Sequence, residues 1–345
     1  MNGLSRLGAT ALLGATAAFG IGAAIPSAAT AADYPAKQIT IVIGYGMGGT
    51  YGQYSQLFAR YLPAQLAGHP AIIVQSMPGA GGLKMVNYAA NVMPATGSYV
   101  FVPPDTMVVS QMLQPEGVKY DARKFHYIGT GEQTNVIWVV RKAAATSIED
   151  LKTKEVVSGH SGPGSTGFLI PAFAKGLLGV KAKLIGGYEG SNKTLLAMQQ
   201  GEIDGVAFGW STFDIGVPQW FEKGKEYAVP ILQVGLVPDP DVPQVPMMSS
   251  LVKEEDRPIV SFLATLGVIG RGLALPPNAS AANTEVLRAA FDKMMADPAY
   301  RADAKKQKLR VNPTSGADLQ KAVVDAIDNS SDAVIAKARK IVFGK

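Results

Sequence analysis

The sequence has 345 residues, of which 47 % are hydrophobic, and it contains no cysteine. Disulfides, thiol catalysis and cysteine metal sites are therefore excluded, and an ordinary apolar core has to stabilise the fold. The formal net charge of +5 comes from Lys and Arg residues scattered through the chain. That distribution is unlike a nucleic-acid-binding surface and is compatible with an anionic ligand. A chain of this length predicts two lobes rather than one.

The first 32 residues have the features of a secretory signal peptide. Arg6 is their only charge, and an Ala-, Leu- and Gly-rich run extends from Leu7 to Ile25. Small residues follow and permit cleavage near Ala31 or Ala32. A membrane anchor is the alternative, because the run approaches the length of a span. Its many Ala, Gly and Thr residues make it only weakly apolar, so we favour cleavage and a periplasmic mature chain.

The mature chain opens with an apolar strand over 38–43, a glycine-rich turn over 44–50 and a helix over 51–62. A strand that ends in glycines before a helix leaves backbone N–H groups unpaired in the field of the helix dipole. That arrangement binds an anion.

A dinucleotide is one candidate anion, because Gly44, Gly46 and Gly49 fit the pattern G-x-G-x-x-G after a strand. The dinucleotide fold also requires an acidic residue at the end of the next strand. That strand, over 70–74, is followed by Gln-Ser-Met at 75–77. We therefore disfavour nucleotide binding.

Two further units follow the first one. A second glycine turn over 77–84 precedes a helical pattern over 85–89, and a strand over 99–102 runs into Pro-Pro-Asp-Thr at 103–106. In open α/β sheets, ligands bind at the carboxyl ends of such strands. Three turns at one sheet edge predict a binding site there.

The middle of the chain repeats this arrangement as a second lobe. An apolar strand over 136–140 and a strand over 156–158 lead into a glycine-rich loop over 159–164, and Ser165 or Thr166 is expected to cap the next helix. Two backbone cradles, one in each lobe, suit a carboxylate held between closing lobes.

A serine hydrolase is an alternative, because Ser161 stands beside His160. The nucleophile elbow requires G-x-S-x-G, however, and Pro163 occupies the position of the last glycine. The chain's three histidines show no metal-binding or base-forming spacing. We therefore expect no enzymatic activity, no cofactor and no metal.

Six ordered motifs carry a family resemblance. They are Asp-Tyr-Pro-Ala-Lys-Gln-Ile at 33–39, Gly-Gly at 48–49, Met-Pro-Gly-Ala-Gly-Gly at 77–82, Ser-Gly-His-Ser-Gly-Pro-Gly-Ser at 158–165, Gly-Tyr-Glu-Gly-Ser at 187–191 and Gly-Glu-Ile-Asp at 201–204. Together they resemble the solute-binding proteins of tripartite tricarboxylate transporters, the TctC or Bug family, over essentially the whole mature chain. Three features depart from the family pattern: Gly52 replaces its site-wall aspartate, Gln56 replaces its arginine, and Gly46-Met47 replaces its Pro-Pro before the Gly-Gly pair.

The resemblance implies an α/β fold of the two-lobe periplasmic binding protein type (type II, hinge-closing), each lobe being a mixed sheet flanked by helices. We expect the first lobe to contain residues 33–135 plus 236–345 and the second residues 136–235, with hinge crossings near 134–138 and 232–237. Towards the C-terminus, Asn283 is expected to cap a helix that stops at Asp297-Pro298.

The expected ligand is a dicarboxylate, a tricarboxylate or an aromatic acid, delivered by a monomer to a permease with one large and one small subunit. Nucleic acid is not an expected partner. A sensor that presents its closed form to a sensory kinase is the other alternative. The predicted ligand-binding residues, some by resemblance alone, are Met47, Gly48, Gly49, Thr50, Tyr51, Gly79, Ala80, Asp105, Thr106, Ser161, Gly164, Ser165, Thr166, Tyr188, Gly190, Asp204 and Phe208.

Overall fold

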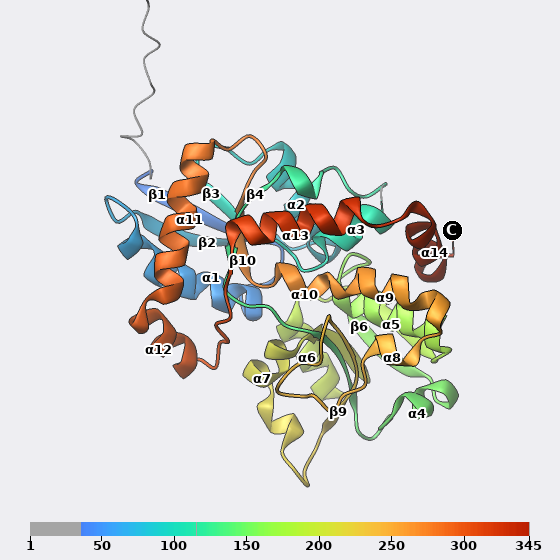
Figure 1. Cartoon of the computed structure of the whole chain (residues 1–345). Coiled ribbons are helices and arrows are strands. Elements are labelled where there is room, and N and C mark those ends of the chain that lie inside the picture. The colour runs from blue at the N-terminus through green and yellow to red at the C-terminus, as the bar shows by residue number, and fades with distance from the viewer. Residues whose placement is uncertain (1–35, 115, 345) are drawn as a thin grey trace, which may run out of the picture. The chain divides into compact units, whose positions relative to one another are not determined.

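A computed structural model describes residues 36–114 and 116–344 (Figure 1). The predicted signal peptide over 1–32 lies outside the described residues. Within them, no helix has the length and the apolar character needed to cross a membrane.

Six strands form the first sheet, in the order β11-β4-β10-β3-β1-β2. Their bounds are β1 (Gln38–Ile43), β2 (Ala71–Ser76), β3 (Tyr99–Val102), β4 (His126–Thr130), β10 (Gly272–Leu275) and β11 (Thr314–Ser315). Strand β1 pairs in parallel with β2 and β3, whereas β10 runs antiparallel to β3 and β4. The sheet is therefore mixed, and β1 lies between the strands that precede the second and third predicted turns.

Helices cover both faces of this sheet because successive side chains of a strand point to opposite sides. Ile39, Ile41 and Ile43 pack against one group of helices, and Val42 packs against the other. The first group is α1 (Thr50–Tyr61), α11 (Ala281–Ala296) and α12 (Pro298–Lys306), and the second is α2 (Leu83–Asn91), α3 (Met107–Leu113) and α13 (Gly316–Asp328). A strand buried on both faces reads as a continuous apolar run, as β1 does.

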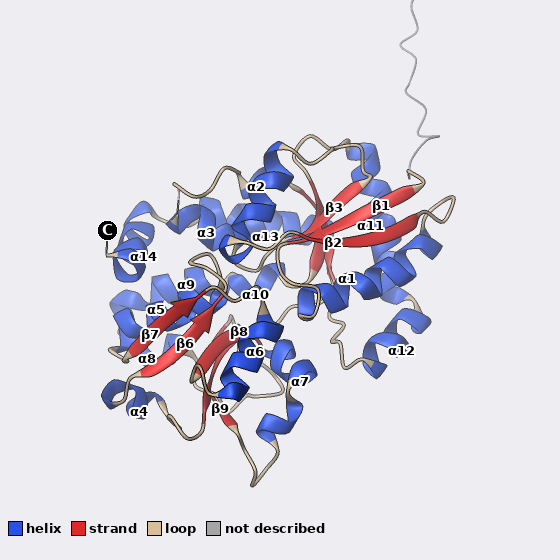
Figure 2. Ribbon diagram, turned by 180° about the vertical axis from the view of Figure 1, so that it is seen from behind, coloured by secondary structure: helices blue, strands red, loops and turns tan. Residues whose placement is uncertain are grey.

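Five strands form the second sheet, in the order β7-β6-β8-β5-β9. Their bounds are β5 (Val136–Arg141), β6 (Val156–His160), β7 (Ala182–Gly186), β8 (Gly205–Gly209) and β9 (Ala228–Val234). Strand β6 is parallel to β7 and β8, and β5 is antiparallel to β8 and β9. Figure 2 shows the two groups of strands as separate sheets.

Helices also cover both faces of the second sheet. Val136, Trp138 and Val140 pack on one side, and Ile137 and Val139 on the other. The helices of the first side are α4 (Ile148–Thr153), α5 (Thr166–Leu178), α8 (Met248–Leu251), α9 (Arg257–Ala264) and α14 (Asp332–Phe343). Those of the second side are α6 (Ser191–Gln200) and α7 (Trp210–Gly216). The short helix α10 (Leu266–Ile269) follows α9. Short 3₁₀ turns occupy Leu62–Gln65, Ala80–Gly82, Ala122–Lys124, Pro218–Phe221 and Glu254–Asp256.

These two mixed sheets with flanking helices confirm the predicted fold class. We call the parts built on the first and second sheets the first and second lobe. The chain passes from β4 to β5 through residues 131–135, and it leaves β9 at Val234. Helix α14 packs on α5 of the second lobe and also contacts α3 of the first. The residue boundaries of the lobes stay a prediction.

One predicted helix cap is wrong, and another has the predicted position but makes no capping hydrogen bond. The α11 cap is Ser280, whose hydroxyl accepts the Asn283 N–H, because the helix begins at Ala281 rather than after Asn283. Ser165 stands at the N-cap position of α5 but does not cap it, because its hydroxyl donates to the Gly162 carbonyl at 2.7 Å. The predicted end of α11 before Asp297-Pro298 is confirmed.

Candidate functional site

A small enclosed cavity of about 30 Å³ lies where the strand ends and helix starts of the two lobes meet. The residues that line it are Tyr45, Gly49, Thr50, Tyr51, Asp105, Ser161, Ser165, Thr166, Gly190, Ser191, Phe208, Gly209, Thr212 and Arg271. Ligand pockets usually measure about 300–1,000 Å³. In this arrangement of the lobes, the cavity is therefore too small for a ligand of ordinary size.

The structure brings most of the predicted site residues to this cavity. They are Gly49, Thr50, Tyr51, Asp105, Ser161, Ser165, Thr166, Gly190 and Phe208. Gly79, Ala80 and Tyr188 line an adjoining hollow of about 320 Å³ that shares Tyr45 and Ser161 with the cavity. Gly48 lines another hollow, of about 200 Å³, on the far side of Thr50.

The remaining four predicted residues line none of these hollows; they are Met47, Thr106, Gly164 and Asp204. Met47 packs at the edge of the first-lobe core. Thr106 donates its hydroxyl to the Gly164 carbonyl at 2.5 Å, which joins the two lobes. Asp204 lies at the start of β8, opposite the end that reaches the cavity, where its carboxylate pairs with Arg141 and accepts the Val157 N–H. Asp204 is thus a structural acceptor.

Four helices begin at the cavity without a side-chain cap: the seven-residue α7, whose N-cap is Gly209, and three longer helices. The N-caps of the longer three are Gly49 for α1, Ser165 for α5 and Gly190 for α6, and none of them accepts a hydrogen bond from its helix through a side chain. Helices α11 and α14 are instead capped by serine side chains. The first N–H groups of a helix lack intrahelical acceptors and carry a partial positive charge. The starts of the three longer helices create a positive field in the cavity.

Part of the predicted backbone cradle is already occupied within the protein. The N–H groups of Gly46, Gly49 and Gly162 donate to Glu189 O, Gly46 O and His160 Nδ1 respectively. The N–H groups of Thr50 and Thr166, in the first turns of α1 and α5, have no acceptor among the described residues. Anion binding is therefore expected at the helix starts rather than along the glycine loops.

A buried ion pair forms the first-lobe wall of the cavity. Nη1 of Arg271 donates to both carboxylate oxygens of Asp105, at 2.6 and 2.8 Å. The Arg271 guanidinium lies over the Tyr51 ring, 4.2 Å from its centroid. The Tyr51 hydroxyl accepts the Asp105 N–H at 3.0 Å. Tyr51 therefore holds both members of the pair in place.

The charge of Arg271 persists in this buried position. Burial by itself lowers the pKa of a guanidinium, but Asp105, Tyr51 and Glu132 together outweigh burial, and the pKa of Arg271 is raised. Burial also raises the pKa of the Tyr45 and Tyr51 hydroxyls, so both stay neutral. The rings of Tyr45 and Tyr51 pack with their centroids 4.5 Å apart and give the cavity an aromatic wall.

Sequence reasoning did not identify Arg271. It lies between Gly270 and Gly272, inside the largely apolar stretch over 259–275. A charged residue within an apolar run was the available signal, since arginine is almost never fully buried unless it is paired. The other lining residues that were not predicted, Tyr45, Ser191, Gly209 and Thr212, carried no comparable signal.

Gly52, which replaces the family aspartate, is required by the local backbone. A Cβ atom at this position would overlap the Met47 carbonyl oxygen. The turn before α1 therefore passes too close for any side chain, and an acidic group cannot project from position 52. The acidic group in the cavity wall is Asp105, which comes from the turn after β3.

Hydrogen bonds between the lobes hold the cleft closed. The hydroxyls of Thr50 and Thr212 lie 3.1 Å apart, and Gly81 donates its N–H to the Ser161 carbonyl at 3.1 Å. At Gly81 the two backbones touch, because an added Cβ would lie 2.6 Å from Gly164 C. The glycine turns over 77–84 and 159–164 therefore form contact surfaces between the lobes.

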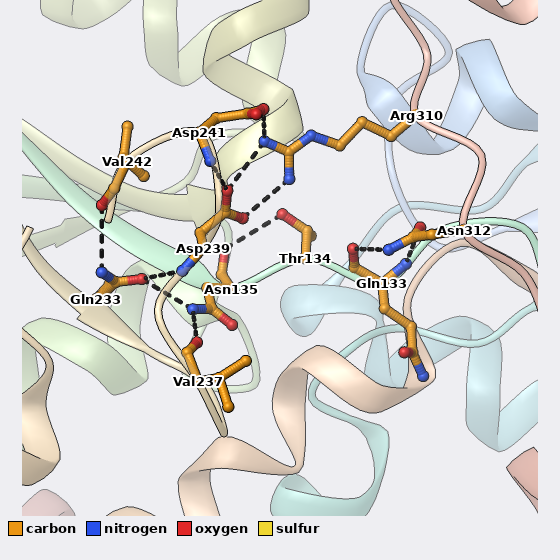
Figure 3. A network of polar contacts seen from close by, with 10 residues as sticks. All are labelled: Gln133, Thr134, Asn135, Gln233, Val237, Asp239, Asp241, Val242, Arg310 and Asn312. Carbon is orange, nitrogen blue, oxygen red and sulfur yellow. Dashed lines mark hydrogen bonds and ion pairs between the residues drawn. The ribbon is translucent and has the colours of Figure 1, made fainter. Parts of the chain in front are cut away.

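A polar network surrounds the chain crossings (Figure 3). Arg310 donates to both carboxylate oxygens of Asp239, at 2.9 and 3.1 Å, and also pairs with Asp241. Asn135 donates to Gln233 Oε1 at 2.8 Å. The network ties the crossing before β5 to the proline-rich loop after β9. This loop forms neither helix nor strand over 236–246, as its prolines predict.

The described residues contain no group of three or more His, Asp or Glu side chains that could hold a metal ion. His160 does not hydrogen-bond to Ser161 in the described part of the chain, and its Nδ1 accepts the Gly162 N–H at 3.0 Å. His160 therefore stabilises the conformation of the loop before α5.

Comparisons with known proteins establish the fold. No family model and no curated protein matches the sequence. Among solved structures, periplasmic binding protein BugD superposes with a TM-score of 0.69 at 17 % identity, covering 88 % of this chain and 98 % of BugD. An R. palustris protein solved with adipate superposes with a TM-score of 0.68 at 19 % identity, covering 89 % of this chain and 98 % of that protein. MatC from Rhodopseudomonas palustris with bound malate superposes with a TM-score of 0.68 at 18 % identity, covering 87 % of this chain and 100 % of MatC.

These superpositions extend over nearly the full length of each neighbour. They agree with the mixed sheets and the cleft described above, and with the motifs that resemble the TctC or Bug proteins. The chain therefore has the two-lobed fold of the periplasmic binding proteins.

Proposed function

We propose that this protein captures a small organic carboxylate in the cleft between its lobes and delivers it to a tripartite tricarboxylate-type membrane transporter. One observation carries the proposal: the uncapped starts of α1, α5 and α6 and a buried arginine meet at one enclosed cavity. Each of these elements favours a negative charge. Two of the superposed structures, solved with adipate and with malate, add support by fold.

The mechanism follows from the closed cleft. A ligand enters while the lobes are apart and places a carboxylate at the starts of α1 and α5. Rotation about the crossings then brings Thr50 to Thr212 and Gly81 to Ser161, and water is excluded. Hinges of this type absorb backbone rotation in a few residues as the lobes close. The closed form is the one presented to a permease with one large and one small membrane subunit.

Export and assembly complete the proposal. The signal peptide is removed near Ala31 or Ala32, and the mature protein acts as a monomer in the periplasm. N-terminal sequencing of the protein from a periplasmic extract tests the cleavage site. Loss of carboxylate uptake on deletion of the gene, with restoration by the intact gene, tests the link to transport.

A thermal-shift screen tests the binding function. The purified protein is heated with malate, adipate, citrate, terephthalate, benzoate or nicotinate. A ligand at 100 times its dissociation constant adds about 2.7 kcal/mol, which raises the melting temperature of a chain of this size by about 4 °C. A rise with at least one carboxylate is expected. The proposal fails if every carboxylate leaves the melting temperature unchanged while a neutral solute of similar size raises it.

A further inference from the structure

Arg271 is a fully buried arginine at the cavity, and all its hydrogen bonds within the described residues go to one partner. Its side chain is 2 % exposed, and it lines the cavity. Within the described residues it makes hydrogen bonds only through Nη1, both to Asp105. A guanidinium has five N–H donors, so three remain, on Nε and Nη2.

Of these remaining donors, Nε is buried without a hydrogen-bond partner in the described part of the chain, and Nη2 lies beside a residue that lines the cavity. Nη2 lies beside Gly209, which lines the cavity from the second lobe, since an added Cβ at Gly209 would be 3.3 Å from it. A buried donor without an acceptor is costly. Glu132 is the other carboxylate near Arg271, and neither of its oxygens has a hydrogen-bond partner within the described residues. The Nε and Nη2 edge is therefore available to a planar, two-oxygen acceptor from outside the protein.

We infer that Arg271 selects the ligand's carboxylate by binding it through the Nε and Nη2 edge of the guanidinium. The inference rests on the proposed function and assigns the chemical selectivity of that site to one side chain. Two parallel hydrogen bonds from an arginine edge match the geometry of a carboxylate.

The surrounding residues prepare Arg271 for this task. Asp105 fixes the guanidinium from the Nη1 side, and the Tyr51 ring supports its face. Because Asp105 and Arg271 together are neutral, the charge of a bound carboxylate is compensated by the starts of α1, α5 and α6. The arginine therefore provides recognition, and the helices provide most of the charge balance. A carboxamide of the same shape presents one oxygen and one NH₂ group, which is a donor facing a donor.

The test compares each carboxylate with its carboxamide in the full-length protein. The probes are adipate, malate and benzoate with adipamide, malamide and benzamide, and titration of tryptophan fluorescence gives the dissociation constants. The decisive variant is Asp105→Asn/Arg271→Gln, which removes both members of the ion pair together rather than leaving one of them unpaired. The matched control is Asp239→Asn/Arg310→Gln. It removes another ion pair, at the chain crossings, in which an arginine donates to both oxygens of an aspartate.

We expect the unmodified protein to prefer the carboxylate, and the Asp105/Arg271 variant to lose about 10- to 150-fold of that preference, because charge-assisted hydrogen bonds are lost. The Asp239/Arg310 control retains the preference, whatever its effect on closure. Arg271→Lys is a second variant, which keeps the charge without the planar edge, and the preference should fall there as well.

An unchanged carboxylate-to-carboxamide ratio in both Arg271 variants would overturn the inference while leaving the proposed function intact. If the unmodified protein binds none of the carboxylates, the proposed function and the inference fall together.

Discussion

Closure of the cleft depends on a contact that only glycine permits. Gly81 has φ +68°, and an added Cβ would lie 2.6 Å from Gly164 C and Ser165 N in the second lobe. Carbon atoms in contact are usually about 3.5–4.0 Å apart. The substitution Gly81→Ala therefore requires the lobes to stay about 1 Å further apart at this point.

The cost can be worked from the hydrogen bonds at that contact. Separation breaks the bond from Gly81 N to Ser161 O and the bond from the Thr106 hydroxyl to Gly164 O. Each contributes about 0.5–1.5 kcal/mol. The closed form then loses about 1–3 kcal/mol, and a ligand that binds the closed form should bind about 5- to 150-fold more weakly.

A matched control separates this effect from backbone strain. Gly179 has φ +70°, and an added Cβ there meets no atom within 4 Å. Alanine at either position carries the same left-handed strain, about 1–2 kcal/mol. Calorimetric titration with a carboxylate from the screen, alongside thermal unfolding, should show both variants less stable and only Gly81→Ala weaker in binding. Equal affinity for the two variants would refute the reasoning.

Three further predictions concern buried groups. Glu132 is fully buried in the crossing to β5, faces Arg271 and Tyr54, and both its carboxylate oxygens lack partners within the described residues. Burial raises the pKa of Glu132, so the stability that its neutral form contributes is complete below its ordinary pKa of about 4.3 and is lost as the pH rises through the raised value. Glu132→Gln should therefore raise the melting temperature more at pH 8 than at pH 4, and a larger gain at pH 4 would contradict this. Gly52→Asp should lower the free energy of unfolding by about 1–3 kcal/mol or more rather than restore an acidic wall, because its Cβ overlaps the Met47 carbonyl. Urea unfolding beside Gly117→Asp, where an added Cβ meets nothing closer than 3.9 Å, would show the difference. Phe58→Ala should cost about 3–5 kcal/mol in the same assay, since its ring is fully buried against Phe291 and Tyr300; a loss below about 1 kcal/mol would mean that the first lobe does not depend on this cluster.

Local patterns predicted much of this molecule because the features concerned are local. The apolar run over 38–43 is buried on both faces and matches β1, and the glycine turns lie at strand ends, as expected for parallel strands followed by helices. The cap error at α11 has the same origin: Ser280 and Asn283 are both good cap residues, and only the actual start of α11 decides between them.

The charged pairs in and near the cavity could not be predicted from local sequence patterns. Arg271 and Asp105 are 166 residues apart in the sequence, and they meet because β10 inserts beside β3. The pairing of Asp204 with Arg141 likewise depends on β8 lying next to β5. Strand order decides which charges meet, and a single sequence does not specify strand order.

Helix α14 gives the two lobes a third attachment. Arg339 donates to the Met112 carbonyl, at the end of α3, while the Phe343 ring stacks on Phe168 of α5. A body joined to another only through two adjacent strands can both bend and twist. A further tie placed away from those strands removes the twist and leaves one bending coordinate. Distance probes placed at different points across the cleft should then report a single, synchronous movement.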